Sequence, residues 1–429
     1  MKLAELPLKP PLLRAINELG LVDATDIQTQ CIPEIMTGND LVGHSRTGSG
    51  KTAAFGLPIL DKIEPGKGVQ ALILTPTREL CVQVAESLSD YSKFMRIRIA
   101  SVYGGVSINP QIDAVKHADI IVGTTGRILD HIDRRTIDFR NTRFLVLDEA
   151  DRMLDMGFIE DVEAIMGVIP SKRQTLLFSA TMPGSIYHLI KEHLRYPVTI
   201  TGEVYVDKRL LRQVYYDVEP EEKFSLLVHL LKKHLKGLSL IFCATRREVD
   251  TVTRNLKENG LNTLAIHGGL TQSRRTNALN ALKKERISIL VATDVAARGL
   301  DIRSVSHVYN YDVPGSPEEY LHRVGRTARA GDEGDAVTLV TYRDFQNFRA
   351  VTSDRTLEII KLEKPLFERV RFQRHSGQRG GGRRPFSGRP RPHHRDGGSN
   401  HRPERWGGGG RRFHPRQQQP SYRGHGRRR

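Results

Sequence analysis

Three carboxylates follow an apolar run in the first half of the chain. Asp148, Glu149 and Asp151 come directly after residues 144–147, which are apolar throughout. Such a run predicts a buried strand whose carboxyl end is acidic. Clustered carboxylates repel one another unless a cation neutralises them, and magnesium is the usual cation. The alternative is the first turn of a helix, where acidic side chains are also common.

A glycine-rich segment lies about 100 residues before this acidic cluster. It consists of Thr47, Gly48, Ser49, Gly50, Lys51 and Thr52. Its glycines would let backbone N–H groups approach phosphate oxygens, and the helix expected to follow adds its dipole. The strict phosphate-loop pattern has a glycine five residues before Gly50, where this chain has Ser45. A glycine-rich turn without a ligand is the alternative, but the downstream acidic cluster favours a phosphate site.

The two segments together predict a nucleotide triphosphatase. Lys51 would reach the β- and γ-phosphates, and the hydroxyl of Thr52 would bind magnesium. Asp148 would also hold the magnesium ion, through water. Glu149 is the candidate general base that orients the attacking water.

Short apolar runs alternate with helical patterns along most of the chain. The runs expected to form strands are residues 71–74, 97–102, 120–122, 144–147, 175–178, 214–218, 240–242, 263–266, 289–291, 308–311 and 337–340. Continuous apolar strands separated by helices indicate parallel sheets that are covered by helices on both faces. In such sheets, ligands bind at the carboxyl ends of the strands. The chemical segments above fall at such ends.

The alternation breaks near residues 203–211, which are polar and charged. We therefore expect an α/β fold with an N-terminal domain over residues 1–205 and a C-terminal domain over residues 206–370. Residues 371–429 are dominated by Gly, Arg, Pro, His and Gln. They cannot bury enough apolar surface to offset the entropy of ordering, so we expect a disordered tail.

The tail carries almost all of the net charge. It contains 17 Arg against one Asp and one Glu, or +15 of the formal +17 of the chain. Five aromatic residues are interleaved with the arginines, namely Phe372, Phe386, Trp406, Phe413 and Tyr422. Arginines attract phosphates and aromatic rings stack on bases, so the tail is expected to tether RNA without sequence preference. A solubilising tail without a partner is the alternative.

Cysteine usage and hydropathy indicate the compartment. Cys31, Cys81 and Cys243 are far apart and do not have the spacing of metal ligands. They are typical of a reducing environment. We see no apolar run long enough for a transmembrane helix and no secretory signal at the N-terminus. A cytoplasmic protein without a membrane contact is expected.

Residues 3–345 resemble a DEAD-box ATP-dependent RNA helicase of superfamily 2, of the prokaryotic type with a basic Arg/Gly-rich tail. The family's motifs occur in order. Beyond the two segments above, they are residues 76–80, 104–105, 124–127, 179–181, 242–245, 272–275, 292–301 and 322–329. The resemblance implies two tandem RecA-like domains, with ATP and Mg²⁺ as cofactors. Cys81 and Thr125 stand where the family commonly has Ala and Pro.

The resemblance implies catalytic roles for residues of both domains. Arg326 and Arg329 resemble arginine fingers that reach the γ-phosphate from the second domain. An arginine finger contributes roughly 10³–10⁵-fold to phosphoryl transfer. Asp301 is similar to the ribose contact of the family. Ser179 and Thr181 resemble residues that couple hydrolysis to strand separation, although a hydroxyl-rich strand end is the alternative for this pair.

The resemblance also implies an RNA path. The residues expected to line it are Arg78, Gly104, Gly105, Thr124, Gly126 and Arg127 in the first domain, with Arg246, Gln272, Arg275, Thr293 and Arg298 in the second. Backbone glycines and short hydroxyls suit contacts to phosphates and 2′-hydroxyls, so little sequence preference is expected. For each arginine, a solvated or salt-bridged surface is the alternative.

Adenine recognition departs from the family pattern. Gln28 matches the glutamine that reads adenine, and an amide pairs well with adenine N6 and N7. The family usually has an aromatic residue upstream that stacks on the base, and Leu3 occupies that position here. We expect adenine preference to survive with weaker stacking.

The leading functional hypothesis is an RNA-dependent ATPase that separates short duplexes locally or remodels ribonucleoprotein. An ATP-gated RNA clamp that anneals strands is the second hypothesis, and a DNA translocase is the third. RNA is the expected partner, with ribonucleoprotein or ribosome-assembly factors as possible further partners.

Overall fold

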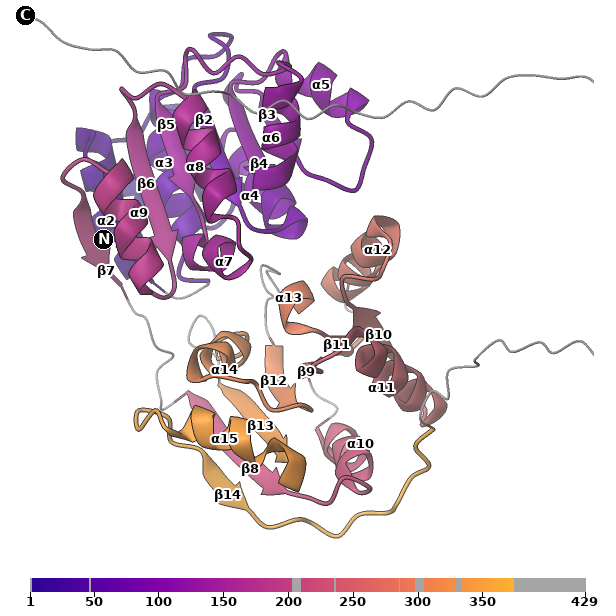
Figure 1. Cartoon of the computed structure of the whole chain (residues 1–429). Coiled ribbons are helices and arrows are strands. Elements are labelled where there is room, and N and C mark those ends of the chain that lie inside the picture. The colour runs from indigo at the N-terminus through magenta and orange to yellow at the C-terminus, as the bar shows by residue number, and fades with distance from the viewer. Residues whose placement is uncertain are drawn as a thin grey trace, which may run out of the picture. The chain divides into compact units, whose positions relative to one another are not determined.

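The computed structural model describes residues 2–45, 48–202, 210–234, 237–284, 286–297, 305–328 and 333–373. These residues form two parallel sheets with their covering helices (Figure 1). The sequence-based expectation of an α/β fold with parallel sheets is confirmed. Some of the predictions concern residues outside the described ranges, namely tail residues 374–429, Thr47 of the phosphate loop, and the motif residues Arg298, Asp301 and Arg329.

The first sheet has seven strands in the order β3-β4-β2-β5-β6-β1-β7. Its strands are β1 (Leu41–His44), β2 (Ala71–Thr75), β3 (Ile99–Val102), β4 (Ile120–Thr124), β5 (Phe144–Leu147), β6 (Gln174–Ser179) and β7 (Val198–Thr201). Its helices are η1 (Leu3–Glu5), α1 (Pro10–Glu18), α2 (Asp26–Thr37), α3 (Lys51–Lys62), α4 (Arg78–Tyr91), α5 (Asn109–Val115), α6 (Thr125–Asp133), α7 (Ala150–Asp155), α8 (Ile159–Val168) and α9 (Gly184–His193).

Alternate side chains of these strands enter two separate cores. In β2, Ile73 packs with α1 to α4 on one face, whereas Leu72 packs with α6, α8 and α9 on the other. Because both faces are covered, the central strands are apolar along their whole length rather than alternating. This arrangement makes the strands rigid supports for the loops at their carboxyl ends.

The second sheet also has seven strands, in the order β10-β11-β9-β12-β13-β8-β14. Its strands are β8 (Leu211–Asp217), β9 (Leu238–Phe242), β10 (Thr263–Ile266), β11 (Ile289–Ala292), β12 (Val305–Asn310), β13 (Gly334–Val340) and β14 (Ile360–Leu362). Its helices are α10 (Lys223–Lys233), α11 (Arg246–Glu258), α12 (Gln272–Lys283), α13 (Asp294–Ala297), α14 (Pro317–Val324), η2 (Tyr342–Asp344) and α15 (Phe345–Thr352). The order repeats that of the first sheet, with each strand replaced by the one seven places later.

Three strands were not predicted from the sequence. β1 contains Gly43 and His44, which interrupt its apolar character. β7 lies at one edge of the first sheet, and β14 is a three-residue edge strand with an exposed lysine, Lys361. Edge strands are half-exposed, so they lack the continuous apolar run that marked the central strands.

The end of the second domain differs from the expectation. Phe372 was assigned to the tail, but its ring packs 4.7 Å from the ring of Phe224 on α10. Next to it, the backbone N–H of Gln373 donates to Asn255 Oδ1 on α11 at 2.7 Å. Residues 363–373 therefore form a strap across α10 and α11.

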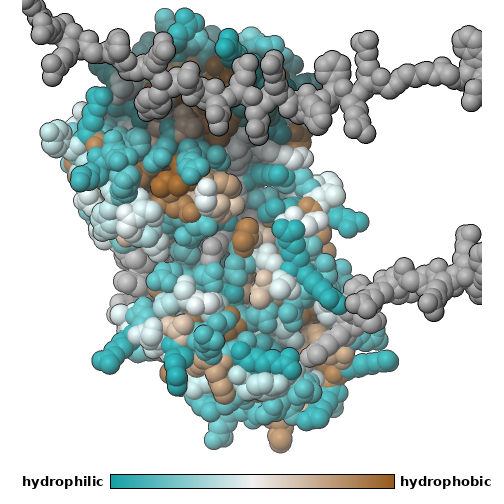
Figure 2. Space-filling model, in the orientation of Figure 1, coloured by the Kyte–Doolittle hydropathy of each residue, from teal (hydrophilic) through white to brown (hydrophobic). Residues whose placement is uncertain are grey.

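The visible surface is mostly hydrophilic, with hydrophobic side chains scattered singly or in small groups (Figure 2). Among the described residues, no helix combines the length and the apolar character that crossing a membrane requires.

Candidate nucleotide site and RNA-binding edge

The phosphate loop lies between β1 and α3. Gly48 and Gly50 have φ values of +82° and +94°, in the left-handed region that favours glycine. Lys51 begins α3 and is only 7% exposed. Its Nζ donates to the backbone carbonyl of Ser45 at 2.9 Å, so the ammonium is held inside the loop. Ser45, which replaces the usual glycine, also places its Oγ 2.9 Å from Ser49 Oγ.

Gln28 connects α2 to this loop. Its Oε1 accepts from Thr25 N at 3.1 Å, and its Nε2 donates to the Gly50 carbonyl at 3.1 Å. A Cβ atom built on Gly50 would clash with that amide, which explains the glycine there. Leu3, the residue in place of the family's aromatic, is 1% exposed and packs in the core with Ile27. Adenine reading by Gln28 stays a prediction.

Asp148 and Glu149 follow β5 and are buried. Burial raises the pKa of Asp148 to about 7, with Glu149 adding to the rise and Lys51 opposing it. Burial also acts to raise the pKa of Glu149, but Arg152, Arg326 and Lys51 outweigh it and lower this pKa to about 2. Glu149 is therefore ionised at neutral pH, with Arg152 Nη1 donating to its Oε2 at 2.8 Å. Its φ of +51° is unusual for a residue other than glycine and marks local strain.

This donor set fits a magnesium ion. Asp148 and the half-buried Thr52 offer the carboxylate and hydroxyl oxygens that Mg²⁺ prefers. The upward shift of the Asp148 pKa reports a buried carboxylate that lacks a sufficient counter-charge. A cation at this position would supply that charge.

Asp151 is the residue of the acidic cluster to which the sequence analysis gave no role. Its Oδ2 accepts from Thr181 N at 2.8 Å, Thr181 Oγ1 at 2.9 Å and Ala180 N at 3.1 Å. Its backbone N–H donates to Ser179 Oγ at 3.3 Å. The backbone N–H of Ser45 donates to the Ser179 carbonyl at 3.0 Å. Residues 179–181 are thus hydrogen-bonded both to the acidic cluster and to the phosphate loop.

The second half of the chain contributes to this site. Arg326, which lies two residues beyond the end of α14, is buried, and its charge lowers the pKa of Glu149. On the same helix, Arg323 binds the two oxygens of Asp294 at 2.6 and 2.7 Å and so fixes α14 against α13. Arg152 Nη2 donates to the Val295 carbonyl on α13 at 3.1 Å. The sequence analysis gave Arg152 and Arg323 no role of their own, because the α13 residues that they contact, Val295 and Asp294, are 143 and 29 residues away.

Arg78 and Arg246 occupy matching positions in the two halves. Arg78 begins α4 and lies against Gly105, where a Cβ atom would clash with its guanidinium. Arg246 begins α11, and a Cβ atom on Gly268 would lie 3.1 Å from its Nη2. In both halves an arginine at a helix start therefore lies beside a glycine.

The other RNA-path candidates of the first half are placed as follows. Gly104 precedes Gly105, Thr124 ends β4, and Gly126 is exposed in the first turn of α6. Arg127 Nη2 donates to the Val106 carbonyl at 3.0 Å, and its Nη1 donates to Gln111 Oε1 at 3.2 Å. Arg127 therefore holds the loop after β3, and any contact it makes with RNA stays a prediction.

Two residues of the second half that were expected on the RNA path, Gln272 and Arg275, contact the first half. Arg275 Nη2 lies 3.0 Å from Glu79 Oε2, and Gln272 Nε2 donates to Glu79 Oε1 at 3.4 Å. Glu79 is buried and adjoins Arg78. Thr293 is buried after β11, where its N–H donates to the Ile266 carbonyl. RNA contacts by these residues stay predictions.

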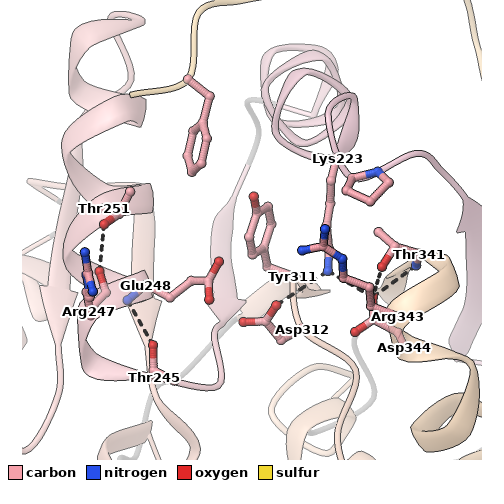
Figure 3. A pocket seen from close by; sticks show the side chains of 12 residues that line it. Lys223, Thr245, Arg247, Glu248, Thr251, Tyr311, Asp312, Thr341, Arg343 and Asp344 are labelled. Atoms are coloured by element: carbon pink, nitrogen blue, oxygen red, sulfur yellow. Dashed lines mark hydrogen bonds and ion pairs between the residues drawn. The ribbon is translucent and has the colours of Figure 1, made fainter. Parts of the chain in front are cut away.

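A cavity of about 400 Å³ lies at the second sheet's equivalent of the phosphate-loop position (Figure 3). Lys223 begins α10 just as Lys51 begins α3. Its Nζ lies 3.5 Å from Asp312 Oδ1 and 3.2 Å from Asp344 Oδ2. The connection from β8 to α10, residues 218–222, has three glutamates and no glycine. This lysine is therefore neutralised by the protein itself.

Comparisons with known proteins agree with this geometry. Residues 25–189 match the DEAD/DEAH box helicase family, and residues 222–331 match the helicase conserved C-terminal domain. The chain is 45% identical over 367 residues to the DEAD-box ATP-dependent RNA helicase CshA of Bacillus cereus, covering 85% of this chain and 70% of that protein. For CshA of Bacillus subtilis, the identity is 44% and the coverage is 84% and 74%.

Solved structures give the same result. S. cerevisiae Dbp5 bound to RNA and ADP BeF3 superposes with a TM-score of 0.78 at 32% identity, covering 85% of this chain and 96% of that one. Mss116p bound to ssRNA and AMP-PNP superposes with a TM-score of 0.75 at 27% identity, covering 83% and 78%. With the phosphate loop, the acidic cluster and both sheets in place, the chain belongs to the DEAD-box family of ATP-dependent RNA helicases.

Proposed function

We propose that this protein hydrolyses ATP when RNA is bound and uses the cycle to separate short RNA duplexes locally or to remodel ribonucleoprotein. The observation that carries this proposal is the continuous set of contacts from Lys51 through Ser45 and Ser179 to Asp151, beside Glu149. The relatives named above are ATP-dependent RNA helicases, and Dbp5 was solved with RNA and a nucleotide.

Within the first half, each group has a definite role in this proposal. Lys51 leaves the Ser45 carbonyl to bind the β- and γ-phosphates, while Gly48, Ser49 and Gly50 offer backbone N–H groups. Asp148 and Thr52 would hold a magnesium ion, which would neutralise charge that develops on the phosphates. Glu149, ionised beside Arg152, accepts a hydrogen bond from the attacking water and orients it.

Hydrolysis in this proposal depends on both halves. The charge of Arg326 lowers the pKa of Glu149, which supports the proposal that Arg326 stabilises charge on the γ-phosphate. Arg329 and Asp301 are proposed as the second arginine and the ribose contact. Because Arg326 and Glu149 come from different sheets, hydrolysis requires the two halves to meet.

RNA is proposed to lie along the carboxyl edges of both sheets. Arg78 and Arg246 would contact phosphates, and the adjoining glycine backbones would contact phosphates or 2′-hydroxyls. Glycine backbones and arginines at helix starts do not read base edges, so the core would bind RNA with little sequence preference. Ribonucleoprotein or ribosome-assembly factors are proposed as further partners.

The basic tail is proposed as an additional RNA tether that raises the local RNA concentration. Truncation after Gln373 tests this idea without removing Phe372 from its packing on α10. The truncated protein should bind RNA more weakly and with a shallower salt dependence, while its turnover at saturating RNA changes much less. An unchanged salt dependence would refute the tether.

We also propose a cytoplasmic location. Cys31, Cys81 and Cys243 are free and buried, which is typical of proteins in a reducing compartment.

A strand-displacement assay tests the main proposal. The full chain, with a short fluorescent RNA duplex, should displace a strand with ATP and not without it. The same RNA should stimulate ATP hydrolysis, and DNA of the same sequence should not. A second candidate, an ATP-gated clamp that anneals strands, is favoured by the 17 arginines of residues 371–429. ATP-dependent annealing without any displacement would support that candidate instead.

A further inference from the structure

A slot lies around the edge strand β10 of the second sheet. In the described part of the chain, β10 is the last strand on this side and pairs with β11 alone. Helix α11 packs on one face of the sheet and α12 on the other, because their buried side chains enter different cores. Figure 1 shows β10 between these two helices. The slot therefore opens toward the free edge of the strand.

The slot is large enough to receive a peptide segment. Its volume is about 660 Å³. Its floor is aliphatic, and the residues concerned are Leu264, Ala265, Leu270, Ala278 and Ala281. Thr253 also lines it, and its buried hydroxyl oxygen has no hydrogen-bond partner among the described residues. An apolar floor with one unsatisfied hydroxyl is suited to aliphatic side chains and a backbone donor or acceptor.

The rim of the slot is basic. Lys257 on α11 and Arg274 on α12 are exposed at opposite sides of the floor. Arg254 also lines the slot, and its Nη2 donates to the Gln373 carbonyl of the strap at 3.1 Å. Among the described lining residues, Asp250 is the one carboxylate, and it lies 2.9 Å from His267 Nε2. The rim therefore favours a ligand that carries negative charge.

We propose that this slot docks an extended, acidic segment of a partner protein, which adds as a strand to β10 and places aliphatic side chains on the floor. An edge strand presents unpaired backbone groups to such a segment, and alternate side chains then enter the slot. The acidic side chains of the segment would face Lys257 and Arg274. The contact adds a protein-binding surface to the second domain, apart from the nucleotide site.

The charge of the rim and the residues that line the slot favour an acidic peptide over the chain's own tail and over single-stranded RNA. The chain's own tail carries +15 over residues 371–429, so the basic rim repels it. Single-stranded RNA is usually held by aromatic rings that stack on bases. The described residues that line the slot include no aromatic side chain. An aliphatic floor with a basic rim therefore fits an acidic peptide better than RNA.

The test uses a labelled synthetic peptide of about ten residues, the length of a long strand, in which Leu or Val alternates with Asp or Glu. A matched peptide has Lys in place of each acidic residue. Binding to the full chain is followed by fluorescence anisotropy. The slot variant is Lys257→Glu, and its control is Lys233→Glu on α10, which makes the same change in net charge at an exposed position.

The acidic peptide should bind the wild type and the control alike, and the slot variant at least about tenfold more weakly. The peptide should also protect the amides of residues 263–266 from hydrogen exchange. Both variants should keep RNA-stimulated ATP hydrolysis, which shows that they fold. Absence of acidic-peptide binding, equal binding of the Lys peptide, protection of these amides by RNA, or self-association abolished by the slot variant would each overturn the proposal.

Discussion

Lys51 and Lys223 each begin the helix that follows the first strand of a seven-stranded parallel sheet, yet their ammonium groups meet different partners. Lys51 contacts a backbone carbonyl, which a phosphate readily replaces. Lys223 is held by Asp312 and Asp344, and a phosphate would have to compete with two carboxylates. The same position in the same topology is therefore open to an anion in one half and closed in the other.

The connections explain this difference. The phosphate loop contains Gly48 and Gly50 with positive φ, a conformation that allows successive backbone N–H groups to form a concave site for an anion. Residues 218–222 are acidic instead and would repel a triphosphate. The strand order fixes where a ligand could bind, whereas the connecting loops decide whether it does.

The RNA-binding edges, by contrast, are alike in the two halves. Thr77 caps α4 before Arg78, and Thr245 caps α11 before Arg246. Each arginine lies over a glycine that follows the next strand, Gly105 or Gly268. The two halves therefore share one arrangement of an arginine over a glycine, which we propose as an RNA contact, but they differ at the lysine that begins the first helix.

The largest expected effect is at Arg326. Replacing Arg326 with Ala should lower the rate constant of RNA-stimulated ATP hydrolysis by roughly 10³–10⁵-fold, because this residue stabilises charge at the γ-phosphate. Nucleotide affinity should change far less. Single-turnover hydrolysis measures the first quantity and titration with a fluorescent nucleotide measures the second. The control is Arg349→Ala on the exposed face of α15. If the Arg326 variant hydrolysed ATP at the wild-type rate, this result would contradict a catalytic contribution from the second half.

A substitution of Lys223 should lower the stability of the protein and should not change the rate of ATP hydrolysis. Lys223→Met leaves Asp312 and Asp344 without their shared partner, and the free energy of unfolding of the second domain should fall by roughly 1–3 kcal/mol. Hydrolysis per folded molecule should not change. Denaturant unfolding measures the loss, with Lys232→Met on the exposed side of α10 as the control. A loss of nucleotide binding in folded Lys223→Met would contradict the comparison of the two lysines.

A substitution of Asp151 should lower strand displacement while nucleotide binding is retained. Asp151→Asn removes the charge from the acceptor of three hydrogen bonds to residues 180–181, a loss of roughly 1–2 kcal/mol. Strand displacement should fall by about tenfold while nucleotide binding is retained. Displacement is compared with that of Asp155→Asn, an exposed carboxylate at the end of the same helix. An equal effect of the two substitutions would show that Asp151 has no special role.

Arg78 and Arg246 should give the smallest effects, and these should match. Replacement of either residue by Ala should weaken RNA binding by about 1 kcal/mol and reduce the slope of log affinity against log salt by about one. Anisotropy titrations at several salt concentrations measure both quantities. If Arg78→Ala acts and Arg246→Ala does not, the RNA path does not use the two halves alike.

Much of the fold followed from the sequence, because central parallel strands are continuous apolar runs. Residues 71–74 and 289–291 are examples, and both form strands where expected. β1 escaped prediction because Gly43 and His44 interrupt it, and β14 because three residues give no pattern. Local sequence does not encode these strands, since their pairing with distant strands stabilises them.

The site could be predicted in part for a similar reason. Lys51 and Asp148 belong to short contiguous motifs, and the residue types and spacing of these motifs predict their chemistry. Asp151 and Glu79 gain their roles from partners about 30 and nearly 200 residues away, which only the folded chain brings together. The sequence also did not reveal that Lys223 and Lys51 occupy equivalent positions in the two sheets, because the two connecting loops share no sequence pattern.

The number of nucleotides bound per chain tests the comparison of Lys51 with Lys223 most directly. Calorimetric titration of the full chain with a non-hydrolysable ATP analogue, in the presence of RNA and magnesium, should give one site per chain. That site should be lost in Lys51→Ala and kept in Lys223→Ala. Two sites per chain, or a site that is lost with Lys223 and survives without Lys51, would contradict the account.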